Sequence, residues 1–141
     1  MVGENHLLKK GDKMLETGEM AKEMPKERKV QIGSSKFTKV LSVDEKEFNA
    51  FHKYEIRKVE TNEVLTAVNF QKGPIKENGI NGIHHEDLIV IVIDRLLAFQ
   101  DCHYRCRENA EAITKLEESL MWLRKRTQDR EDRGVEGTSK I

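Results

Sequence analysis

The last third of the chain predicts one long helix whose two halves differ in chemistry. In the first half, apolar residues recur at steps of three and four and therefore share a helix face: Ala110, Ile113, Leu116, Leu120 and Leu123. Beyond this stripe, Arg126, Arg130 and Arg133 follow at steps of four and three, so three guanidinium groups can point the same way. The pattern predicts a helix that packs through its first half and presents arginines to an anion with its second.

Length and charge exclude several classes of protein. A chain of 141 residues makes one domain with room for one appendage. Lys plus Arg and Asp plus Glu number 25 each, so no global field attracts a nucleic acid polymer or a membrane. Hydrophobic residues make up 37% of the chain and charged residues 35%, which favours burial of part of the apolar surface against a second copy.

Targeting signals are also missing from the pattern. The longest apolar run, Leu88 to Ile93, is too short for a membrane span, and Leu7-Leu8 is too short for a secretory signal. The two cysteines, Cys102 and Cys106, do not form a disulfide framework. We therefore expect a cytoplasmic protein.

The first 34 residues are polar and mixed in charge, and we treat them as an N-terminal extension. Three interpretations stay open: a weak amphipathic helix, a mobile arm, or an arm that orders only against a partner subunit. The helix would use scattered apolar residues, namely Leu7, Leu8, Met14, Leu15, Met20 and Met24.

Residues 35–75 change to a period of two, which predicts a small antiparallel β-sheet. Segments 53–59 and 64–70 are rich in β-branched and aromatic residues, with a hairpin turn at 61–63, and 37–43 adds a third strand. A loop over 76–84 follows, because Asn-Gly pairs interrupt the pattern. Loops of this kind often line a site.

Residues 85–133 predict an antiparallel αα-hairpin, followed by a C-terminal tail at 134–141. The apolar run after Asp87 would also suit a buried strand, but Glu86 and Asp87 favour a helix N-terminus. Helical spacing supports this choice, since it relates Leu88, Ile91, Val92, Leu96 and Phe99. Gly134 and Gly137 end the second helix. The predicted fold class is thus α+β, a sheet followed by a long helical hairpin that oligomerises through its helices.

Two groups of side chains are candidates for a ligand site, and each has a structural alternative. The arginine face can bind phosphate through bidentate contacts, or it can be a solvated surface paired with Asp129, Glu131 and Asp132. Phe99 and Asn109 can sandwich a flat base where the two helices meet, or serve as a core residue and a helix-start residue.

Metal binding and catalysis have little support in the sequence. Cys102, His103 and Cys106 do not have the spacing of zinc ligands, even with His84 and His85 upstream, so we expect no metal and no cofactor. No nucleophile turn or phosphate-cradling glycine loop is present, so we do not expect an enzyme. Trp122 is interpreted as a packing residue.

Two segments carry a resemblance to a known family. NFQKGPIKENGINGIHHEDLIVIVIDRLLAFQ and CRENAEAITKLEESLMWLRKRTQDREDRGVEG resemble the bacteriophage Thoeris anti-defence proteins, which share a helical-hairpin domain with anti-CBASS sponges. The resemblance covers roughly residues 53 to 138. The first 30 or so residues and the connector DCHYRC depart from the family pattern.

The resemblance implies that the protein binds and sequesters a cyclic ADP-ribose isomer without cleaving it, in the cytoplasm of the infected bacterial host. It implies a homodimer, or a hexamer built as a trimer of dimers, with pockets between subunits and in some members a separate site for cyclic trinucleotides. Adenine would lie between Phe99 and Asn109, and the phosphates would contact Arg126 and Arg130. Arg105 and Arg107, near the hairpin bend, are weaker candidates.

Three functions therefore follow from the sequence. The first is sequestration of a cyclic ADP-ribose-type immune signal, which would block the Thoeris effector. The second is a sponge for CBASS cyclic trinucleotides or dinucleotides, alone or in addition. The third is an oligomerisation module without a ligand.

Overall fold

The computed structural model describes residues 12–14, 20–22, 26–32 and 36–141. The chain divides into two compact units, Met1–Val68 and Asn69–Ile141. We call them the sheet unit and the hairpin unit, and each is described by itself.

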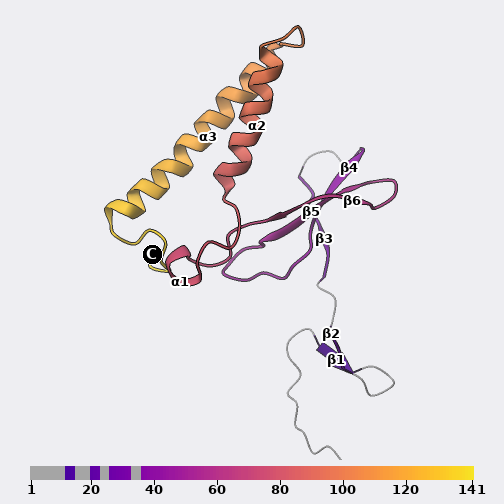
Figure 1. The fold of residues 1–141 in the computed structure, drawn as a ribbon, viewed down its shortest axis with the longest axis vertical. Helices are drawn as coiled ribbons and strands as arrows, with labels where there is room; N and C mark the ends of the chain where they lie inside the picture. The colour runs from indigo at the N-terminus through magenta and orange to yellow at the C-terminus, as the bar shows by residue number, and fades with distance from the viewer. Residues whose placement is uncertain (1–11, 15–19, 23–25, 33–35) are drawn as a thin grey trace, which may run out of the picture. The chain divides into compact units, whose positions relative to one another are not determined.

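A sheet of four strands forms most of the described part of the sheet unit (Figure 1). Its order is β3 (Arg28–Lys29), β4 (Thr38–Ser42), β5 (Lys53–Lys58) and β6 (Val64–Asn69). β4 pairs antiparallel with β5 and places Val40 opposite Ile56. The turn after β5 contains Asn62 at a φ of 63°, a conformation that Asn tolerates better than most residues. The three predicted strands and the turn between the last two are confirmed.

The N-terminal segment contributes strands that the sequence did not predict. β3 pairs antiparallel with β4, so the sheet begins before residue 35, within the predicted extension. Further upstream, β1 (Asp12–Met14) pairs antiparallel with β2 (Met20–Lys22). At these residues the weak amphipathic helix is therefore wrong, because the backbone hydrogen bonds run between strands. The residues of the predicted arm at 1–11, 15–19, 23–25, 33 and 34 lie outside the described part of the chain.

Arg57 joins the N-terminal segment to the sheet. Its side chain is only 9% exposed, and its guanidinium contacts Glu27 at 2.8 Å and Glu55 at 2.6 Å. The hydrogen bond from Arg57 lowers the pKa of Glu27, and both carboxylates raise the pKa of Arg57. A buried guanidinium needs such partners, since an unpaired charge in this place would be costly.

The predicted loop at 76–84 is more ordered than its glycines suggest. It begins with a helical turn, α1 (Ile75–Asn78). The side chain of Asn81 closes the loop, because it accepts a hydrogen bond from the Lys72 N–H at 2.7 Å and donates one to the Lys72 carbonyl at 2.8 Å. Gly82 is required by close packing, since a Cβ at this position would lie 2.4 Å from the Phe70 carbonyl group.

α2 (His85–Gln100) and α3 (Arg107–Asp132) form the predicted antiparallel hairpin (Figure 1). The Gln100 amide and the Cys106 backbone exchange two hydrogen bonds of 2.9 Å, which closes the bend. α3 buries Ile113 and Leu120, each 8% exposed, in agreement with the predicted stripe. The α+β class is confirmed.

α2 contributes less to this core than its sequence suggests. None of its residues is buried, and Ile91 remains 62% exposed. Four more of its apolar side chains are also exposed: Val90, Val92, Leu97 and Phe99. Helical spacing thus identified the helix, but Ile91, Val92 and Phe99 do not lie in the core of one copy of the chain.

α3 ends as its glycine predicts. Gly134 has a φ of 70°, and the Val135 N–H donates across it to the Arg130 carbonyl at 3.0 Å. This is the Schellman arrangement, for which glycine is the usual residue. The turn directs residues 135–141, here called the C-terminal segment, back along the end of α3. Hydrogen bonds to α1 hold this segment, from the Lys76 N–H to the Gly137 carbonyl at 2.9 Å and from the Ser139 hydroxyl to Glu77 at 3.0 Å.

Candidate ligand-binding site

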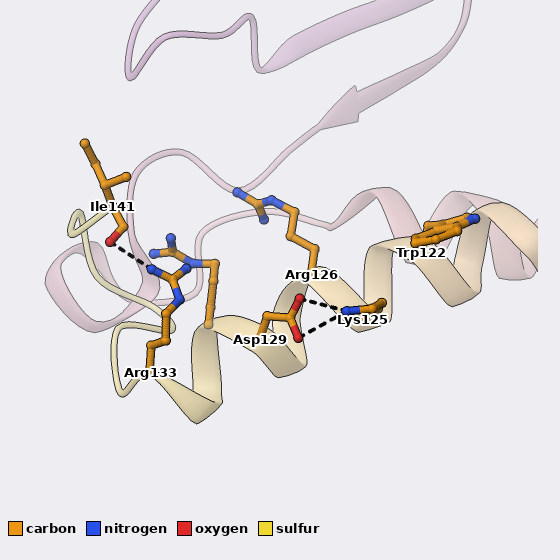
Figure 2. Close-up of a pocket in the computed structure, with 7 residues that line it drawn as sticks. Trp122, Lys125, Arg126, Asp129, Arg133 and Ile141 are labelled. Atoms are coloured by element: carbon orange, nitrogen blue, oxygen red, sulfur yellow. Dashed lines mark hydrogen bonds and ion pairs between the residues drawn. The ribbon is translucent and has the colours of Figure 1, made fainter.

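A groove of about 360 Å³ lies at the end of α3 (Figure 2). The predicted arginines, Arg126, Arg130 and Arg133, all line it. The remaining lining residues are Trp122, Lys125, Asp129 and Ile141. The structure therefore brings the three arginines together along one surface, as their spacing predicts.

Arg130 is held by the C-terminal segment. Its Nη2 group donates to the carbonyl oxygens of Val135, Thr138 and Lys140, each at 3.0 Å. Nη2 belongs to both forks of a guanidinium, the one it shares with Nε and the one it shares with Nη1. In this conformation Arg130 therefore has no complete fork for bidentate contact with phosphate, which the sequence could not show.

The other cations of the groove differ in their partners. Arg133 donates from Nη1 to the main-chain oxygen of Ile141 at 3.0 Å, and Lys125 pairs with Asp129 at 3.1 Å (Figure 2). Arg126 makes no hydrogen bond or ion pair with residues 26–32 or 36–141. The predicted carboxylate pairing of the arginine face is thus absent among these residues, since the one nearby ion pair of Asp129 is with Lys125.

The second predicted pair, Phe99 and Asn109, lies at the hairpin bend. Phe99 is 38% exposed, and the Arg95 guanidinium lies 5.2 Å from its ring centre. The Asn109 N–H donates to the sulfur of Cys106, which begins the helix. A cation over the aromatic ring was not predicted, although Arg95 precedes Phe99 by four residues and therefore shares its helix face.

Arg105 and Arg107 also lie at the bend. Arg105 lines a hollow of about 270 Å³ together with Gln100, Asp101, Cys102 and His103. Arg107 is exposed and has Glu111 at 3.9 Å from its Nε. Both side chains are exposed to solvent. They lie at or just before the start of α3, whereas the arginine groove lies at its end.

The two halves of the predicted site are far apart within one chain. Asn109 and Arg126 belong to the same helix and are 17 residues apart, which corresponds to about 25 Å along the axis. This separation exceeds what one cyclic dinucleotide-sized ligand can span. A site that uses both groups therefore requires two copies of the chain, with the bend of one beside the arginines of the other.

A second groove, of about 420 Å³, lies between the start of α2 and the end of α3. Its ionic residues include the carboxylates Glu86, Glu131 and Glu136 and the single guanidinium of Arg124. This balance disfavours an anion. The part of the chain with described side chains contains no group of three metal-binding residues. It also contains no helix long and apolar enough to cross a membrane.

Trp122 is interpreted from the sequence as a packing residue, and the structure differs on this point. It is 59% exposed, so it is not a packing residue of the single chain. Its position four residues before Arg126 was a usable signal, because that spacing places both side chains on one face of α3.

The helical hairpin is also found by comparison of the sequence with known protein families. Residues 62–128 match the protein family described as "Acb2/Tad1, hairpin domain". The matched range comprises β6, α1, α2 and most of α3. Arg126 lies inside the matched range, whereas Arg130 and Arg133 follow its end.

One relative is "Thoeris anti-defense 1" of Bacillus phage SBSphiJ7. It is 65% identical over 74 residues, which are 52% of this chain and 52% of that protein. The similarity to the Thoeris anti-defence family that the sequence indicates is confirmed. The match spans about half the length of this relative.

Proposed function

We propose that this chain is a phage anti-defence protein that binds and sequesters a cyclic ADP-ribose-type immune signal inside the infected bacterium. Sequestration would keep the signal from its Thoeris effector. The observation that carries the proposal is the groove at the end of α3, where three arginines converge in a chain that matches the Acb2/Tad1 hairpin domain.

The charges of the groove suit a pyrophosphate. Its lining holds four cationic side chains, Lys125, Arg126, Arg130 and Arg133, against one acidic side chain, Asp129. Arg126 has no partner among the described residues, so its fork is open to a phosphate. Contacts between a guanidinium and a phosphate join two opposite charges and are therefore stronger than the contacts that Arg130 makes with neutral carbonyl oxygens.

The apolar surface of α2 supports a homodimer, from which a hexamer could be built. Ile91, Val90 and Leu97 are exposed in the single chain, and a surface of this kind is typical of an interface. In the proposed dimer, Phe99 and Asn109 of one subunit approach Arg126 and Arg130 of the other. Such a site lies between rigid helices, which lowers the cost of ordering on binding. Arg105 and Arg107 would then border the site from the bend.

The proposed activity is binding rather than cleavage. A sponge must hold its ligand longer than the host sensor does, so slow dissociation matters more than chemistry. To test this, the protein is mixed with extract from messenger-producing cells, purified again and boiled. We expect an intact cyclic ADP-ribose isomer in the supernatant, and an opened product would show an enzyme instead.

The alternative functions are separated by calorimetry with cyclic ADP-ribose isomers, cyclic dinucleotides and cyclic trinucleotides. Heat with only the last two classes would assign the protein to CBASS signals. The exposed apolar face of α2 also fits an oligomerisation module without a ligand, which would give no heat with any nucleotide.

A further inference from the structure

The bend between α2 and α3 contains a small hydrogen-bonded frame, here called the bend frame, made by Gln100, Cys102 and Cys106. Gln100 Oε1 accepts from the Cys106 N–H, and Gln100 Nε2 donates to the Cys106 carbonyl, each at 2.9 Å. Gln100 is the last residue of α2, and Cys106 precedes the first residue of α3. Hydrogen bonds are directional, so two of them between one pair of residues fix how the two helix ends are joined.

The two cysteines connect this frame to the backbone of the residues proposed to hold the base. The Cys102 thiol donates to the Phe99 carbonyl at 3.1 Å. The Cys106 sulfur accepts from the Asn109 N–H at 3.4 Å, in the place of an N-cap side chain. Each side of the proposed base subsite therefore has a hydrogen bond to the bend frame.

A base that is held on both faces is sensitive to the width of its subsite. Contact on each face puts the two flanking groups about 7 Å apart, twice the best separation of two carbon atoms. A gap that is wider by about 0.5–1 Å already forfeits about a quarter to a half of the contact energy. Phe99 and Asn109 lie on different helices, so this width depends on how the two helix ends are joined.

We propose that Gln100, Cys102 and Cys106 are positioning residues that set the width of the base subsite between Phe99 and Asn109. The inference rests on the proposed function, because it takes the position of the base from it. It adds a role for the connector DCHYRC, which departs from the family pattern. The three side chains act through Phe99 and Asn109 and do not themselves contact the ligand.

Two probes separate the base subsite from the arginines. The full-length protein is titrated by calorimetry with a cyclic ADP-ribose isomer, which uses both, and with inorganic pyrophosphate, which uses only the arginines. Gln100→Met keeps the length of the side chain but removes both of its bonds to Cys106. It should weaken binding of the isomer about three- to tenfold, by the lost share of base stacking, and leave pyrophosphate binding within about twofold of wild type.

Substitutions of Cys106 test the same frame from the other helix. Cys106→Ala removes the acceptor of the Asn109 N–H and should show the same loss, for the isomer only. Cys106→Ser restores an acceptor, because serine is a preferred N-cap residue, and should bind the isomer within about twofold of wild type. Gln128→Met is the matched control and should change neither affinity. It is the same substitution, but the hydrogen bond that it removes joins Gln128 to Asp132 near the other end of α3, also at 2.9 Å.

Each result supports or overturns the inference. It is overturned if folded Gln100→Met or Cys106→Ala binds the isomer as tightly as wild type does, or if either loses affinity equally for both probes. It is also overturned if Cys106→Ser loses as much affinity as Cys106→Ala. Circular dichroism checks the fold, and if Gln100→Met is unfolded the two Cys106 variants decide. Wild-type protein that binds pyrophosphate but no cyclic nucleotide overturns the proposed function as well, which distinguishes the two failures.

Discussion

Arginines in the two units of the molecule have opposite surroundings. In the sheet unit, Arg57 is buried and contacts two carboxylates, Glu27 and Glu55. In the hairpin unit, Arg130 contacts backbone carbonyl oxygens, and Arg126 has no partner among the described residues. Carboxylates neutralise a guanidinium, whereas carbonyl groups leave its charge in place. The acceptors around an arginine, rather than the residue type, therefore separate a structural arginine from one available to an anion.

The largest effect is expected from removing the uncompensated charge. Arg126→Ala should weaken binding of the cyclic ADP-ribose-type ligand by about 100-fold or more, because it removes two charge-assisted hydrogen bonds. Arg130→Ala should also abolish tight binding, and both variants should keep the oligomeric mass of wild type. Calorimetry and light scattering measure the two quantities.

Arg57→Met is the matched control for these variants. It should lower the thermal stability of the protein, because Glu27 and Glu55 lose their shared partner, while ligand affinity stays within about twofold. A loss of affinity in Arg57→Met equal to that in Arg126→Ala would remove the distinction between the two classes of arginine.

A smaller effect is expected from releasing Arg130. A chain that ends at Gly134 lacks the carbonyl groups that occupy Nη2 of Arg130, so both of its forks become available to phosphate. We expect about tenfold tighter binding, because the phosphate no longer has to displace these carbonyl groups from Arg130. If truncation weakens binding instead, the segment orients Arg130 for the ligand. Circular dichroism of the truncated chain checks that the helices persist.

A further effect comes from changing the ion pair of Lys125 and Asp129 within the groove. Asp129→Asn removes the one acidic side chain of the groove lining, and Lys125→Ala leaves that side chain without its 3.1 Å partner. Binding should become about threefold tighter in the first variant and about threefold weaker in the second, by the magnitude of exposed charge interactions. The difference should shrink at high salt, because exposed charges are screened. Titrations at two salt concentrations provide the measurement.

The smallest effect is a pH dependence of the protein's stability that comes from Glu27, the carboxylate paired with Arg57. The hydrogen bond from Arg57 lowers the pKa of Glu27 from its ordinary value of 4.5. A lowered pKa in the folded state stabilises the protein fully above the unfolded value, and the contribution disappears as pH falls through the folded value. The melting temperature of wild type should therefore decline below about pH 4.5, and Glu27→Gln should remove part of that slope. Equal slopes in the two proteins would show that this pair does not contribute.

Much of the fold could be predicted from the sequence, because hydrophobic period and turn residues act locally. The helices α2 and α3, the turn at Asn62 and the helix end at Gly134 all followed from such patterns. β3 could not be predicted, since two exposed residues acquire strand structure only through pairing with β4. α1 could not be predicted, because the glycines on both sides of it indicate a loop. The contacts that hold it come from a segment about 60 residues away in the chain.

The site was predicted only in part for a related reason. Helical spacing placed the three arginines on one groove, but it could not show that Arg130 donates to the C-terminal segment. The 25 Å between Asn109 and Arg126 follows from residue count alone, and the structure makes its consequence plain, since a single hairpin cannot bring these groups together. Trp122 was misjudged because a large aromatic residue beside an apolar stripe usually belongs to the core.

Phosphorus-31 NMR of a cyclic ADP-ribose isomer mixed with the protein shows directly whether the arginines bind the pyrophosphate of an intact ligand. With wild type, we expect both pyrophosphate resonances to shift and broaden, and to return unchanged when the protein is heat-denatured. With Arg126→Ala they should stay at the positions of the free ligand. Unshifted resonances with wild type, or new resonances from an opened ring, would contradict the account.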